Sequence, residues 1–269
     1  MVGKSLRYRI LVPSSERKRA GGVRVRDFRA AQLDRAANRF ASLNKERMQA
    51  LDTFLHALNG AGHAREVLRL NGALLDKAVR MNLAFREAPL LDVLQREHGP
   101  LFAALDAPSL DSAARRRLRN EMVLVCPLLG LLSPADEVPE YRCPIGAQIP
   151  GFGSLHAFWK PRISPVLDRL ARGRRIWSFL PARLQALWTQ SGTSAEIVHV
   201  LFMRTSKSGR ALADHAGAQR LAGELSRVLL ASATTSPADL TGWTSTEGHH
   251  LREDLSRQQG NVRTLVFAR

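Results

Sequence analysis

Five short runs of apolar residues constrain the fold of this chain most, because each of them predicts a buried strand. β-Branched and aromatic side chains are enriched in these runs, as is typical of strands. Segments with apolar residues at three- and four-residue steps lie between them, the longest from Asp27 to Asn59. This alternation predicts a mixed α/β (α+β) fold. The five runs are Tyr8–Val12, Met122–Cys126, Ile176–Leu180, Glu196–Met203 and Val262–Ala268.

Four further segments carry a helical pattern. Ala64–Leu75 and Leu90–Leu105 are predicted helices, and Ser109–Asn120 is a predicted helix with a capping serine and a basic carboxyl end. We expect the arginines at that end, Arg115–Arg117, to face solvent. The stretch Gly153–Gly173 is amphipathic but holds two prolines, which predict a kink or a break.

The 269 residues show no repeat, low-complexity tract or linker, so we expect a single compact domain over residues 1–269. No apolar run reaches the roughly 18 residues of a membrane span, and the N-terminal apolar stretch is too short for a signal peptide. Cys126 and Cys143 have neither metal-ligand spacing nor a disulfide framework. These features predict a cytoplasmic protein that does not enter a membrane.

The chain is strongly basic. Its 40 Lys and Arg residues exceed its 24 Asp and Glu residues, which gives a formal net charge of +16, and most of the cations are arginines. Arginine matches phosphate oxygens in a bidentate manner, so the excess fits a nucleic acid or another anionic ligand. Arginine- and alanine-rich usage also follows from a GC-rich coding sequence. Composition leaves both explanations open.

The familiar catalytic and metal-binding motifs are absent from the sequence. It has no nucleophile elbow, no nucleotide-binding P-loop, no zinc-protease helix and no paired C-x-x-C. His249 and His250 are adjacent and therefore point in different directions, which favours two solvent or edge histidines over a metal site. We expect no metal and no cofactor, and the residues leave open whether the protein is an enzyme.

Three polar segments follow strand candidates and concentrate the functional residue types. The first, after Val12, combines hydroxyls, cations and glycines in a way that suits an anion-binding rim. Glu16 is a weak candidate for a general acid or base, but a structural ion pair across the loop is the favoured interpretation. The candidate DNA- or anion-binding residues of the three segments are Ser15, Lys18, Arg19, Arg142, Arg204, Lys207 and Arg210.

These motifs, in this order, resemble the YaaA family of peroxide-stress proteins. They read P-x-S-E-x-K from Pro13, G-L-L-x-P-x-D-x-x-x-x-Y-R-x-x-x-G from Gly130, L-x-x-F-W from Leu155 and F-x-[KR]-x-x-K from Phe202. The resemblance ends with L-T-G-W from Leu240 followed by Glu247 and Gly248, and it covers nearly the whole chain. Residues that match the family motifs are Ser15, Glu16, Lys18, Tyr141, Arg142, Gly146, Arg204 and Lys207.

The resemblance implies a compact mixed α/β domain with a positively charged cleft and a helix-hairpin-helix-like element. It also implies binding of double-stranded DNA and protection against oxidative damage. The chain departs from the family pattern at residues 126–130, at Ser208 and over Ile176–Trp188. If the hairpin element lies at 126–130, Pro127 has no N–H to donate to a phosphate.

Two hypotheses follow. The first is a duplex-DNA-binding protein of the peroxide-stress response, monomeric and without a cofactor. The second is a divergent enzyme that uses the same basic cleft for an anionic, nucleotide-like small molecule. In either case we expect Lys18, Arg142, Arg204 and Lys207 to converge on one concave face, and Arg115–Arg117 to lie away from it.

Overall fold

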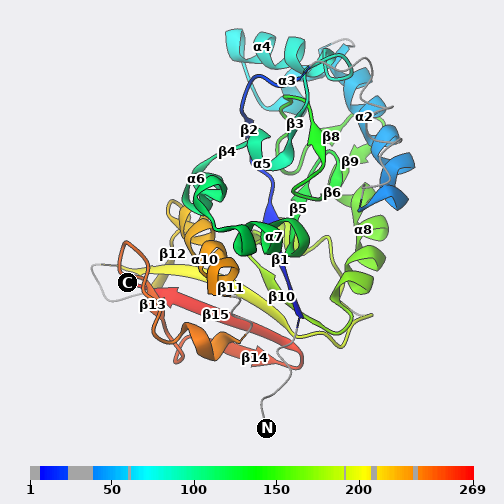
Figure 1. Ribbon diagram of the computed structural model, residues 1–269. Helices are drawn as coiled ribbons and strands as arrows, with labels where there is room; N and C mark the ends of the chain where they lie inside the picture. The colour runs from blue at the N-terminus through cyan, green and yellow to red at the C-terminus, as the bar shows by residue number, and fades with distance from the viewer. Residues whose placement is uncertain (1–6, 24–38, 60–61, 191, 207–210, 233–235) are drawn as a thin grey trace.

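A mixed β-sheet forms the centre of the protein in a computed structural model, which describes residues 7–23, 39–59, 62–190, 192–206, 211–232 and 236–269 (Figure 1). Five neighbouring strands run parallel, and antiparallel strands flank them. The strand order is β13 (His250–Leu251), β15 (Val262–Ala268), β11 (Ile197–Thr205), β10 (Arg174–Ser178), β1 (Arg7–Pro13), β5 (Met122–Cys126) and β6 (Gly130–Leu132), with β12 (Ala211–Ala213) on β11 and β14 (Arg257–Gln259) on β15.

The five parallel strands are the five apolar runs of the sequence, and the prediction of a mixed α/β fold is confirmed. Every residue of β5 is buried, as are six of the seven residues of β1. Strands of a parallel sheet are covered on both faces and therefore read as continuous apolar runs. Two runs match their strands residue for residue, and the other three differ from theirs by one or two residues at each end.

Helices surround the sheet and also form a separate group beside it (Figure 1). α7 contacts β1 and β5, α10 contacts β11, α7 and α6, and α8 contacts β6 and β10. The helices are α2 (Asn44–Asn59), α3 (Ala64–Leu68), α4 (Gly72–Leu83), α5 (Val93–Arg96), α6 (Pro100–Leu105), α7 (Ser112–Glu121), α8 (Leu155–Ala171), α9 (Ala182–Gln185) and α10 (Ala218–Ser232), with 3-10 turns at Ala41–Leu43, Ala107–Ser109 and Pro237–Leu240. Short strand pairs are β2 (Arg17–Lys18) with β4 (Glu97–His98), β3 (Leu91–Asp92) with β7 (Glu137–Val138), and β8 (Gln148–Ile149) with β9 (Gly153–Ser154).

Of the predicted helical segment Asp27–Asn59, residues 27–38 lie outside the described residues, and α2 covers only its second half after a 3-10 turn. Three other predicted helices also differ from the structure. The segment Ala64–Leu75 is split into α3 and α4, because Arg69 adopts a left-handed conformation that ends the first helix. Leu90–Leu105 is split into α5 and α6 by β4 and by Gly99, whose backbone is extended. α7 begins at Ser112, later than predicted, because the side chain of Asp111 caps it.

The proline-containing segment does not break, because α8 continues through Pro161 and Pro165, and the alternative of a kink stays a prediction. Each proline removes one backbone hydrogen bond from a helix. Burial compensates for this loss, since α8 places Phe158, Trp159 and Ile163 in the core.

The segment at 126–130 forms the turn of the β5–β6 hairpin, so it holds no helix-hairpin-helix element. The guanidinium of Arg47, in α2, is buried against this hairpin and donates to the main-chain oxygens of Leu129 and Leu131. It also donates to Asn44 Oδ1. One buried arginine thus joins α2 to the edge of the central sheet.

Within the residues that the structure describes, the helices are all too short or too polar to cross a bilayer.

Candidate functional site

The carboxyl ends of β1 and β5 lie side by side, because the two strands are parallel neighbours. β1 pairs with β5 on one side and with β10 on the other, so the order of the strands changes direction at β1. Ligands of parallel α/β sheets commonly bind at such a point. The loop that leaves β1 carries Ser15, Glu16, Lys18 and Arg19, four of the predicted site residues.

Lys18 lies in a buried ion pair at this edge. Its ammonium is 3.1 Å from Oε1 of Glu97 and 3.2 Å from Oε2, and both side chains are almost completely buried. The main-chain N–H of Ser15 donates to the same carboxylate at 2.5 Å, and its hydroxyl also donates to Glu97. Its hydroxyl accepts a bond from the main-chain N–H of His98 at 3.0 Å. The charge of Lys18 is therefore matched inside the protein.

A buried layer of sulfur and aromatic groups lies behind this ion pair. The Lys18 ammonium is 4.8 Å from the centre of the Tyr141 ring, and the Tyr141 hydroxyl is 3.0 Å from Sγ of Cys126. Burial raises the pKa of Tyr141 and also that of Cys143 well above their ordinary values. We call Ser15, Lys18, Glu97, Tyr141 and Cys126 the Lys18 cluster.

The structure brings together some of the predicted cations. Arg142 pairs with Glu16 at 2.7 Å, next to Tyr141 and Lys18, so Glu16 takes part in an ion pair across loops. Arg204 is exposed on β11, and no described contact joins it to Lys18 or Arg142. Lys207 and Arg210 lie outside the described residues. The convergence of all four cations on one face stays a prediction.

Arg19 lines an open cavity of about 580 Å³ between the β1 loop and α7. Arg115 and Arg119 line the same cavity, together with Glu97 and His98. Arg115 is exposed, as predicted, although it shares this cavity with Arg19, and its separation from the predicted cleft stays a prediction. Helix α7 is amphipathic, and its buried face directs part of the basic side toward the β1 loop.

A second open cavity, of about 600 Å³, lies at the opposite edge of the sheet, where β1 and β10 begin. Arg7 and Arg174 are partners in the β1–β10 register, which places two cations at one strand pair. The cavity shares Arg119 and Ala135 with the first one, so the two adjoin. We call the five arginines that line it the arginine pocket: Arg7, Arg9, Arg39, Arg119 and Arg174.

Cations outnumber carboxylates in the arginine pocket. Arg9 pairs with Glu121 and Arg39 interacts with the charge of Asp136, whereas Arg7, Arg119 and Arg174 form no ion pair with a carboxylate among the described residues. Burial lowers the pKa of Arg9, and three neighbouring guanidinium groups of the pocket lower it further. Like charges held this close repel one another, and an anion bound among them removes that repulsion.

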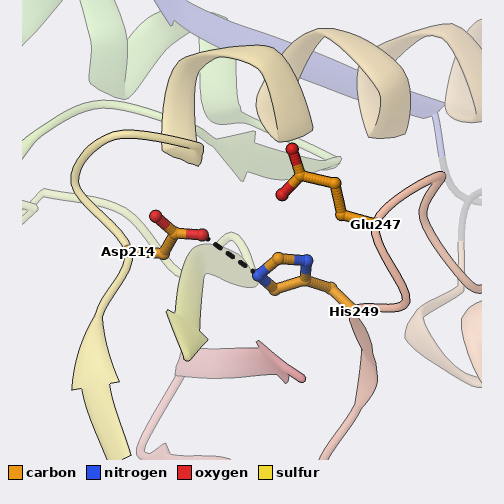
Figure 2. A group of neighbouring side chains, drawn as sticks. All are labelled: Asp214, Glu247 and His249. Carbon is orange, nitrogen blue, oxygen red and sulfur yellow. Dashed lines mark ion pairs between the residues drawn. The ribbon is translucent and has the colours of Figure 1, made fainter. Parts of the chain in front are cut away.

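A third group of polar side chains lies near the ends of β11 and β15. Asp214, Glu247 and His249, which we call the His249 cluster, face one another (Figure 2). Nε2 of His249 is 3.3 Å from Oδ2 of Asp214, and both side chains are buried. Burial lowers the pKa of His249, so that its imidazole is neutral at neutral pH. This set of donors has the residue types of a metal site.

Sequence reasoning assigned neither the arginine pocket nor the His249 cluster. Glu247 and His249 are two residues apart, a spacing that places two side chains on the same side of an extended segment. That spacing was the available signal for the cluster. Asp214 lies more than thirty residues earlier in the chain, and only the pairing of the strands brings it close.

Comparison with known proteins gives one family over most of the chain. The family model described as Peroxide stress protein YaaA matches residues 9–255. A UPF0246 protein of Streptomyces coelicolor is 29% identical over 95% of this chain and 96% of its own length. A UPF0246 protein of Corynebacterium efficiens is 34% identical over 59% of this chain and 61% of its own length. One from Laribacter hongkongensis is 29% identical over 64% of this chain and 67% of its own.

Proposed function

Because this chain belongs to the YaaA family of peroxide-stress proteins, we propose that it binds duplex DNA and limits oxidative damage to it. The observation that carries the proposal is the arginine pocket, three of whose five cations form no ion pair with a carboxylate among the described residues and do not interact with Asp136. The adjoining cavity, with Arg19, Arg115 and Arg119, extends this basic surface. The phosphates of DNA supply the missing negative charge.

The geometry favours contacts to phosphates over contacts to bases. The pocket is built from arginines on separate segments, and guanidinium groups match phosphate oxygens well. No described feature of the pocket resembles a recognition helix, so binding is expected to be independent of sequence. The cleft that we propose is therefore centred on the arginine pocket, with Arg19 at its margin, and Lys18 supports the loop from inside.

A pair of double variants with the same loss of charge tests this proposal. Arg119→Gln with Arg174→Gln removes two pocket cations. Arg116→Gln with Arg172→Gln removes two exposed cations, one from the helix that holds Arg119 and one from the turn just before Arg174. We expect the pocket variant to lower the slope of log affinity against log salt by about 2, since each phosphate contact contributes about 0.9. Equal losses in both variants would show that binding follows net charge and not the pocket.

Protection against oxidation is tested separately. Supercoiled plasmid is exposed to hydrogen peroxide and ferrous iron with each protein, and nicking is measured on agarose gels. We expect wild-type protein and the Arg116/Arg172 variant to reduce nicking, and the Arg119/Arg174 variant to protect less. Protection by all three proteins to the same extent would contradict a mechanism that depends on binding at the pocket.

A second candidate function is an enzyme for an anionic, nucleotide-like small molecule. The observation that favours it is the cavity of about 580 Å³ beside the Lys18 cluster, which combines Arg19 with Glu97 and His98. Small-molecule sites commonly have volumes of about 300–1,000 Å³. Denaturing the purified protein and analysing the released molecules by mass spectrometry separates the two functions. A stoichiometric anionic ligand together with weak DNA affinity at physiological salt would favour the enzyme.

A further inference from the structure

The His249 cluster has the spacing of a shared metal ion. One ligand atom from each of Asp214, Glu247 and His249 lies within 4.8 Å of the other two. Two ligands that are each about 2.1 Å from one metal, at a tetrahedral angle, lie about 3.4 Å apart. The separation of 3.3 Å between Nε2 of His249 and Oδ2 of Asp214 fits that arrangement.

The buried ring nitrogen that faces Asp214 is only weakly satisfied by that carboxylate. His249 is fully buried, and its Nε2 and Oδ2 of Asp214 lie 3.3 Å apart without good hydrogen-bond geometry. A polar atom without a partner in a protein interior is costly, and such atoms are rare. Figure 2 shows this nitrogen pointing at the Asp214 carboxylate, with Glu247 on the same side. A bound cation would satisfy both atoms.

The remaining polar atoms of these side chains are already held in place. Nδ1 of His249 is 3.3 Å from the Ser245 hydroxyl, and Oδ1 of Asp214 accepts a bond from the Gly217 N–H at 3.0 Å. Partners of this kind orient the ligands of a metal site and fix which atom is free to bind. The remaining polar atoms, Nε2 of His249 and Oδ2 of Asp214, face the centre of the cluster.

The guanidinium of Arg269 lies beside the two carboxylates of the cluster. Its guanidinium is 3.0 Å from Glu247 and 4.0 Å from Asp214, while its side chain is 42% exposed. Arg220 pairs with Glu247 at 2.6 Å and also with Glu224. If Arg269 swings into solvent, the three carboxylates and the remaining guanidinium leave a net charge of −2. That charge is balanced by one divalent cation.

We propose that the His249 cluster binds a divalent first-row transition-metal ion through Asp214, Glu247 and His249, and that Arg269 competes with this ion. One imidazole and two carboxylates suit ions such as Zn²⁺, Co²⁺ and Mn²⁺. Three protein ligands leave further positions of the ion open for water or a ligand. The site is separate from the arginine pocket, so this proposal does not depend on DNA binding.

Metal titration of the chelator-treated full-length protein tests the proposal. Zn²⁺ is followed by calorimetry, and Co²⁺ by its visible absorption, which reports coordination by protein ligands. We expect saturable binding of one ion per chain, weakened more than about tenfold in His249→Ala and Asp214→Asn. His250→Ala is the matched control, because His250 is adjacent but exposed, and it should bind as the wild type does.

Arg269→Gln gives a result in the opposite direction. Removing the competing cation should tighten Zn²⁺ binding several-fold and raise the melting temperature in the presence of the ion. If His249→Ala fails to fold, Arg269→Gln still tests whether the cluster binds a metal ion. The proposal is overturned if neither the wild type nor Arg269→Gln shows saturable binding. Equal loss of binding in His250→Ala and His249→Ala overturns it as well.

Discussion

The arginine pocket and the Lys18 cluster lie at opposite edges of the same sheet and use positive charge in opposite ways. In the Lys18 cluster one buried ammonium meets one buried carboxylate, and Ser15 supplies further bonds to that carboxylate. In the arginine pocket five cations are opposed by two described carboxylates, Glu121 beside Arg9 and Asp136, which acts on Arg39. Matched charge holds the protein together, and unmatched charge is available to a ligand from outside.

The largest expected effect comes from breaking the matched pair. Lys18→Met leaves the Glu97 carboxylate buried without its counter-charge, so we expect the free energy of unfolding to fall by about 3–5 kcal/mol. Urea denaturation followed by circular dichroism measures it. The double variant Lys18→Met with Glu97→Gln should recover much of the loss. A cost below about 1 kcal/mol for Lys18→Met would show that the pair is not a structural element.

Removing unmatched charge should leave stability nearly unchanged. Arg119→Gln with Arg174→Gln relieves repulsion in the arginine pocket, so we expect the free energy of unfolding to change by less than about 0.5 kcal/mol in either direction. Sulfate, a small dianion, should raise the melting temperature of the wild type more than that of this variant, as measured by differential scanning fluorimetry. A similar rise in both proteins would place the anion elsewhere.

The exposed ion pair between Arg142 and Glu16 should have an intermediate effect on the free energy of unfolding. Its side chains are 29% and 44% exposed, so water already screens the interaction. We expect Arg142→Gln to cost no more than about 1 kcal/mol in urea denaturation. A loss as large as that of Lys18→Met would mean that the charge of Arg142, like that of Lys18, is needed for folding.

The smallest expected effect concerns the two cysteines. Both are buried and reduced, and the raised pKa of Cys143 keeps its thiol protonated at neutral pH. Because the thiolate is the form that reacts with peroxide, we expect no sulfenic acid in the native protein after brief peroxide treatment. Mass spectrometry with a dimedone label measures this, and urea-unfolded protein is the positive control. Rapid labelling of native Cys143 would contradict the buried, protonated state.

The sheet could be predicted from the sequence better than either charged site. Met122–Cys126 and Val262–Ala268 are strands with the predicted bounds. The first is a continuous apolar run that is buried throughout, whereas the second is buried only over its last four residues. The split of Leu90–Leu105 could not be read from its apolar spacing. Glu97 pairs there with Lys18, which is 79 residues away, and β2–β4 pairing extends the chain locally. Such a contact depends on the tertiary fold.

The candidate sites show the same limit. The loop after β1 was predicted from its residue types, and Lys18 and Arg142 do lie near each other around Tyr141. Nothing in the sequence distinguished a matched cation from an unmatched one, because that difference depends on which carboxylates the fold brings close. The five arginines of the arginine pocket come from four segments of the chain, so no local motif marks the pocket.

The contact of Arg47 with the β5–β6 hairpin has a consequence for local unfolding of the protein. Its buried guanidinium holds two main-chain oxygens of the hairpin, so α2 cannot separate from that edge of the sheet without leaving those groups unsatisfied. The amide hydrogens of α2 and of β5 should therefore exchange with solvent through one shared opening event. Two segments more than sixty residues apart would then behave as a single cooperative unit, closed by one side chain.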